Sequence, residues 1–100
     1  MPVDDSTLMK ALATVVDPEL GLAITDLGLV RGLHLQGDSC ELRLTMTSAA
    51  CPQGDLIAAE AEEALLRVLP PGSRCTVLLE WDPPWTPDAM SERARKLMRL

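Results

Sequence analysis

The sequence predicts an α/β (α+β) fold, a two-layer sandwich with its elements in the order α-β-β-α-β-α. Two segments with alternating apolar residues are joined by Gly37-Asp38, which indicates a β-hairpin. A third strand-like segment follows a helical one, so its return to the sheet needs a crossover helix. At 100 residues, 47% of them hydrophobic, the chain predicts a single domain over residues 1–100.

The first helix is expected to follow a capping region at residues 2–6. Apolar residues then recur at the spacing of one helical face: Leu8, Ala11, Leu12, Val15 and Val16. Asp17-Pro18 is predicted to end this helix, because proline disfavours helical geometry in the residue before it. Residues 19–28 show no regular pattern and predict a loop, and a loop of this length in a small domain is often functional.

The hairpin strands are predicted at residues 29–36 and 40–47. In the second strand one face is apolar and the other polar, since Cys40, Leu42, Leu44 and Met46 alternate with Glu41, Arg43, Thr45 and Thr47. A second helix is predicted from about residue 53 until Pro70-Pro71-Gly72. Its apolar face would contain Ile57, Ala61, Ala64, Leu65 and Val68, with Glu63 and Arg67 paired on the outside.

The third strand is predicted at residues 75–81, with Cys75, Val77, Leu79 and Trp81 on one face. A rigid, proline-rich loop at residues 82–88 comes next. The last helix is predicted from about residue 88 to residue 98. Its inward residues would be Met90, Ala94, Leu97 and Met98.

Charge and composition argue against nucleic acid and membrane as partners. Fifteen acidic and nine basic residues give a formal net charge of -6, which repels a phosphate backbone. Trp81 and Trp85 are the only aromatic residues, so bases would find little to stack on. No apolar run approaches the ~20 residues of a membrane span, and residues 1–5 do not resemble a signal peptide. Three widely spaced cysteines suggest no disulfide framework, so we expect a cytoplasmic protein.

The three cysteines are not equivalent. Cys40 and Cys75 share the phase of the inward residues of their strands, which favours small buried side chains. Cys51 lies between a strand and a helix and is followed by Pro52, so it is predicted to be the N-cap. The positive end of a helix dipole favours the thiolate, which is the nucleophilic and metal-binding form. An exposed thiol at a turn, with no function, fits this position equally well.

Four polar residues near the predicted turns are further candidates. Asp17 and Glu19 follow the first helix, Asp26 lies in the irregular loop, and Thr47 ends the second strand. Each has an ordinary structural explanation, as a turn former or as a strand threonine. His34 is the only histidine, so a histidine-based zinc site or a cysteine–histidine pair has no support. Trp85 is expected either to fill the core or to anchor a partner.

Four motifs, in order along the chain, resemble those of one known family: Asp17-Pro18-Glu19, residues 24–30, Thr45-Met46-Thr47 with Cys51-Pro52, and residues 82–87. The chain is similar to the MIP18 family, long called domain of unknown function 59 (DUF59), which includes SufT-like and PaaD-like proteins. The resemblance covers nearly the whole chain. It implies an iron–sulfur cluster assembly domain-like fold and a role in the maturation of iron–sulfur proteins.

The resemblance also implies a set of site residues. The family's reactive cysteine falls on Cys51, the expected metal ligand, and the other cofactor-binding positions fall on Asp17, Glu19, Asp26 and Thr47; no catalytic residue is implied. Two features depart from the family. Residues 48–50 read Ser-Ala-Ala where the family commonly carries Pro-Gly, and the cysteine-bearing tail of the PaaD branch does not follow Leu100.

Ligand counting limits what such a chain can hold. An iron–sulfur cluster usually has four thiolate ligands, whereas one cysteine here lies outside the predicted core. We therefore expect transient binding of a cluster or of iron, with no tightly bound cofactor. A homodimer sharing a cluster through two copies of Cys51, completed by carboxylates or external thiols, fits this count. An adaptor between the assembly machinery and its client apoproteins fits it too.

Two other functions remain open at this level. A thiol-dependent enzyme would use Cys51 as its nucleophile and Asp17 or Glu19 as its proton acceptor. A plain interaction module would dock a partner through the loop around Trp85. The resemblance favours the assembly role, which is not enzymatic.

Overall fold

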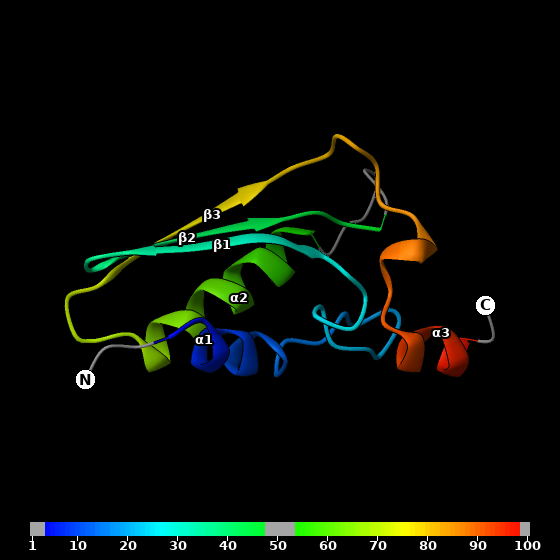
Figure 1. Ribbon diagram of the computed structural model, residues 1–100, viewed down its shortest axis with the longest axis horizontal. Coiled ribbons are helices and arrows are strands. Elements are labelled where there is room, and N and C mark those ends of the chain that lie inside the picture. Colours follow the sequence, from blue (N-terminus) through cyan, green and yellow to red (C-terminus); the bar gives the residue numbers. More distant parts are fainter. Residues whose placement is uncertain (1–3, 48–53, 99–100) are drawn as a thin grey trace.

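The computed structural model describes residues 4–47 and 54–98. Its elements follow the predicted order, with one short 3₁₀ helix added before the last helix (Figure 1). They are α1 (Asp5–Leu12), β1 (Val30–Gln36), β2 (Ser39–Leu44), α2 (Gly54–Val68), β3 (Arg74–Leu79), η1 (Pro87–Ala89) and α3 (Glu92–Met98).

The sheet has the strand order β1-β2-β3. β1 and β2 are antiparallel and form the predicted hairpin, in which Gln36 faces Ser39 and Gly37 adopts a φ of +60°. β3 is parallel to β2, with Cys75 beside Cys40. A parallel neighbour needs a crossover, and α2 provides it.

The two layers are the sheet and the pair of helices α1 and α2, which lie on the same side of it (Figure 1). The central strand β2 shows why: Cys40, Leu42 and Leu44 are at most 2% exposed, while the residues between them are exposed. α2 contributes the predicted buried residues Ile57, Ala61, Ala64 and Leu65. The core therefore lies between one face of the sheet and the two helices.

The first helix is shorter than predicted. α1 begins at the expected cap, where Asp4 accepts a hydrogen bond from the Thr7 N–H at 2.9 Å, but it ends at Leu12. Beyond that point the backbone pairs with the following loop, since the Ile24 N–H donates to the Val15 carbonyl at 2.9 Å. Val15 stays buried, whereas Val16 is 42% exposed. Pairing with the following loop thus replaces the last helical turn that periodicity predicted.

The last helix also departs from the prediction. It begins at Glu92, because residues 87–89 form η1 and Met90 is extended. Met90 and Ala94 are buried as expected, but Leu97 is 62% exposed and Met98 is exposed as well. α3 lies at one end of the molecule (Figure 1), and among the described residues Leu97 and Met98 stay on the surface there.

The strands differ from the prediction in three further respects. β2 ends at Leu44, so the alternation stops there and Thr45, predicted to be on the polar face, is 1% exposed. β3 ends at Leu79, and Trp81, predicted to face inward, is 43% exposed. Val77 and Leu79 are only partly buried, because β3 is an edge strand.

Candidate functional site

The predicted site residues occupy different environments. Cys51, with its expected helix-capping role, lies outside the described residues. Asp17 is buried, Glu19 is exposed, and Asp26 and Thr47 are partly buried. All four of the acidic and threonine candidates lie in the segments between helices and strands. The two aspartates make different contacts there.

Asp17 organises the turn that follows α1. Its Oδ1 accepts hydrogen bonds from the backbone N–H groups of Glu19, at 2.8 Å, and Leu20, at 3.3 Å. Its own N–H donates to the Leu22 carbonyl, and its carbonyl accepts from the N–H of Gly21. Asp17 is only 3% exposed, and the N–H groups of Glu19 and Leu20 offset the cost of burying its carboxylate. Asp17 therefore shapes the chain around Glu19, whose side chain stays in solvent.

Asp26 holds the C-terminal part of the chain. Its Oδ1 accepts a hydrogen bond from the Ser91 hydroxyl at 3.0 Å, and its Oδ2 lies 3.6 Å from the Arg93 guanidinium. Its carbonyl also accepts from the Ser91 N–H at 2.7 Å. The Ser91 oxygen in turn accepts from the Ala94 N–H at 3.1 Å, which caps α3. Ser91 is 65 positions from Asp26, so no local pattern in the sequence reveals this contact.

Two more contacts join the same segments. The Trp85 indole N–H donates to the Leu27 carbonyl at 2.6 Å, and its ring packs against the core. Gly28 has a φ of +74°, and a Cβ built there would clash with the Ala89 carbonyl oxygen. We call residues 85–93 the clasp, because they fasten onto the loop at residues 24–28. These contacts fit the first of the two roles expected for Trp85, that of filling the core.

Thr45 is a residue that sequence reasoning missed. Its N–H donates to the Leu29 carbonyl at 2.8 Å, and its buried hydroxyl has no hydrogen-bond partner within the described structure. It follows the last residue of β2, between the hairpin and the segment that leads to α2. Strand alternation placed it in solvent, and nothing local in the sequence marks the point where the alternation ends.

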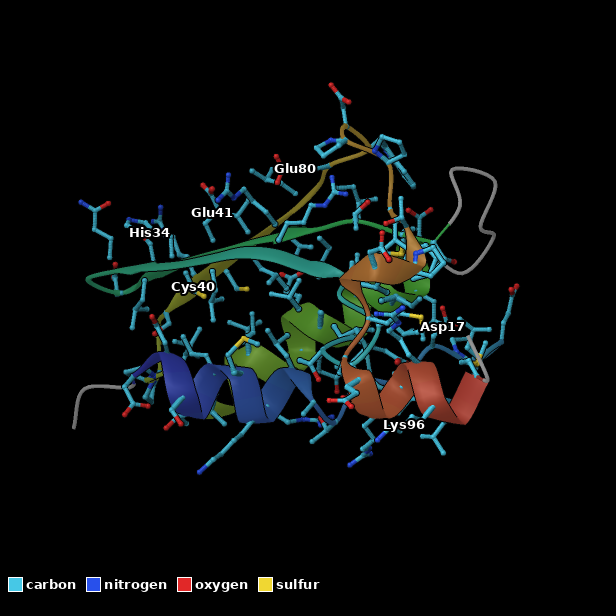
Figure 2. All side chains as sticks on the ribbon, turned by 45° about the vertical axis from the view of Figure 1, so that its right-hand side comes forward. Asp17, His34, Cys40, Glu41, Glu80 and Lys96 are labelled. Atoms are coloured by element: carbon cyan, nitrogen blue, oxygen red, sulfur yellow. The ribbon has the colours of Figure 1, made fainter. Side chains whose placement is uncertain are left out.

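Cys40 and Cys75 are neighbours across β2 and β3. Cys40 is buried between the sheet and the helices, as Figure 2 shows, and Cys75 is partly buried. Burial raises the pKa of the Cys40 thiol, and it raises the pKa of Cys75 to about 12. Both thiols are therefore protonated near neutral pH, and a protonated thiol is a poor nucleophile and a poor metal ligand.

The remaining donors do not gather around a point. Figure 2 shows His34 and Glu41 on the open face of the sheet, away from Asp17. Within residues 4–47 and 54–98, no three histidine, cysteine or acidic side chains are close enough to hold a metal ion.

Comparison with known proteins shows the class of protein to which the chain belongs. A crystal structure of a DUF59 domain from Bacillus anthracis aligns with a TM-score of 0.89 and 31% identity, covering 96% of this chain and 92% of that one. The chain thus has the DUF59 fold. A family model described as iron-sulfur cluster assembly protein matches residues 5–79, and the chain belongs to this family. The resemblance inferred from its motifs is confirmed.

Two curated relatives are similar over most of their length. One is the Fe-S protein maturation auxiliary factor YitW of Bacillus subtilis, 42% identical over 88% of this chain and 86% of the relative. The other is the Fe-S protein maturation auxiliary factor SufT of Staphylococcus aureus, 38% identical over 81% of this chain and 92% of the relative. None of the described helices is long and apolar enough to cross a membrane.

Proposed function

We propose that this chain is a maturation factor for iron–sulfur proteins, which passes iron or a cluster to client apoproteins through the thiol of Cys51. The observation that carries the proposal is the contrast among its cysteines. Cys40 and Cys75 lie in the sheet with raised pKa values, which leaves Cys51 as the candidate thiolate. Membership of the assembly family, and relatives named as maturation factors, support the cellular role.

The cluster or iron is cargo in this proposal. One thiolate is too few for a cluster, so the other ligands come from a donor protein, a client, or external thiols. Because the other ligands belong to other molecules, binding is expected to be transient. The expected partners are the assembly machinery and the client apoproteins. A reduced, cytoplasmic thiol suits this role, because Cys51 must stay unoxidised between transfers.

The acidic and threonine candidates have two different roles in this proposal. Asp17 and Asp26 commit their carboxylates to the turn and to the clasp, so they position the loop at residues 17–28. Glu19 and Thr47 are the candidates for contact with the cargo, because neither side chain is fully buried. The carboxylate of Asp17 is occupied by backbone N–H groups, which argues against its use as an enzymatic proton acceptor.

Anaerobic reconstitution with iron and sulfide tests the role of the thiol. Cys51→Ser should abolish the visible absorbance of the bound cargo, because a hydroxyl stays protonated near neutral pH and is a poor ligand for soft metals. Cys75→Ala is the matched control, and it should retain the absorbance because the Cys75 thiol is protonated. In cells, Cys51→Ser should accumulate normally while iron–sulfur enzymes lose activity. Full enzyme activity with Cys51→Ser would contradict the proposal.

A further inference from the structure

β3 exposes an unpaired edge. Within the described residues it pairs only with β2, and the N–H groups of Arg74 and Glu80 donate to the Asp38 and Leu44 carbonyls at 2.8 and 2.7 Å. Backbone groups alternate in direction along a strand, so the even-numbered residues face β2. The N–H and C=O groups of Cys75, Val77 and Leu79 therefore point away from the sheet, where another strand can bind them.

The two edges of the sheet differ in their protection. β1 has a register shift between Val30 and Gly32, and it carries Arg31 and His34, features that hinder strand pairing. β3 has no charge, glycine or proline between Arg74 and Glu80. Its edge is therefore regular, and it is uncharged between these two residues.

The core is also incompletely covered at β3. Leu42 and Leu44 of β2 are fully buried, whereas Val77 and Leu79, in register with them, are only partly buried. On the opposite face Leu78 is 44% exposed. A strand added beside β3 would cover apolar side chains on both faces of the sheet.

We propose that two copies of this chain pair through β3, antiparallel about a twofold axis at Val77, so that their sheets become continuous. In this register Cys75 faces Leu79 of the partner subunit and the two Val77 residues face each other. Every outward N–H and C=O of the strand then finds a partner. This pairing uses only β3 and Glu80, so it does not depend on the proposed function.

The same register is complementary in charge. It places Arg74 opposite Glu80 of the partner subunit, and the twofold axis repeats the pair. Among the described side chains Arg74 has no ion pair, and Glu80 has only a 3.8 Å contact with Arg43. Opposite charges directly across an antiparallel pair are stabilising and like charges are destabilising. A shift of two residues in one direction would place Arg74 opposite Leu78 and lose both pairs, and a shift in the other direction would move Arg74 opposite Asp82, beyond the end of β3.

Charge reversal tests this register. Sedimentation equilibrium of the full chain at low salt should show a dimer. Arg74→Glu and Glu80→Arg should each raise its dissociation constant about tenfold, because each puts like charges face to face twice. The double variant R74E/E80R should recover most of the affinity. Lys10→Glu and Glu60→Arg make the same charge changes on exposed helix positions, and they should leave the dissociation constant unchanged.

Amide exchange provides a second readout. The Val77 N–H points to solvent in a single copy, so its exchange should slow as protein concentration rises, whereas the Thr76 N–H should be protected at all concentrations. A wild-type chain that stays monomeric at millimolar concentration would overturn the proposal. A dimer that is insensitive to both single reversals would overturn it as well, since it would use another surface.

Discussion

Asp17 and Asp26 show how a carboxylate can organise a loop, Asp17 through backbone N–H groups and Asp26 through the Ser91 hydroxyl and Arg93. Asp17 accepts two backbone N–H groups in a turn, and Asp26 accepts the Ser91 hydroxyl at the start of α3. Charged acceptors make stronger hydrogen bonds than neutral ones, so both residues fix the loop between them. Asp17 thereby holds the turn at Glu19, and Asp26 holds the clasp.

Cys75 is expected to make the stability of the folded protein fall as pH rises in the alkaline range. Its folded-state pKa is raised from 9.0 to about 12 by burial, so the folded protein holds this proton more tightly than the unfolded chain does. Its stabilising contribution is therefore complete below pH 9 and is lost as pH rises toward 12. Urea unfolding between pH 8 and 10.5 should show stability falling with pH, and Cys75→Ala should reduce that slope. An unchanged slope in Cys75→Ala would assign the dependence to other groups.

At the level of elements, α3 depends on contacts outside itself. It has seven residues, of which only Ala94 is buried, and isolated helices of this length are unstable in water. The Ser91 hydroxyl both caps the helix and donates to Asp26. The clasp therefore converts a weak helix-forming segment into an ordered element.

Ser91→Ala should lower the free energy of unfolding by about 1–2 kcal/mol, because it removes a cap and a hydrogen bond to a charged group. Hydrogen exchange should accelerate in α3 and around Asp26. Thr86→Ala is the matched control, since Thr86 precedes η1 without a side-chain capping bond, and it should change stability by less than about 0.5 kcal/mol. Equal losses in the two variants would contradict the role of Ser91.

At the level of the whole molecule, one apolar layer between the sheet and two helices carries the stability. Leu44, on the middle strand β2, is fully buried, whereas Leu97 is 62% exposed at one end. Leu44→Ala should cost ~2–5 kcal/mol in urea unfolding, because it leaves a cavity in a packed core. Leu97→Ala should change stability by less than about 0.5 kcal/mol. A small change in the free energy of unfolding with Leu44→Ala would show that Leu44 is not part of the packed core.

Local patterns determined the fold class and most of the elements. The hairpin at Gly37-Asp38, the apolar face of α2 and the need for a crossover depend on short-range spacing, and all three are confirmed. The motifs likewise sufficed to recognise the family. The role of Cys51 stays a prediction, since its position lies outside the described residues.

Tertiary contacts decided the rest. The early end of α1, the burial of Thr45 and the exposure of Leu97 depend on which segments lie alongside, and periodicity carries no information about neighbours distant in sequence. The same holds for Asp26 and Ser91, whose contact joins residues 65 positions apart. The sequence by itself determined which segments form helices and strands, because that depends on local spacing. Only the folded chain decided where those segments end and which polar groups meet, because backbone groups are satisfied by whatever partner the packing supplies.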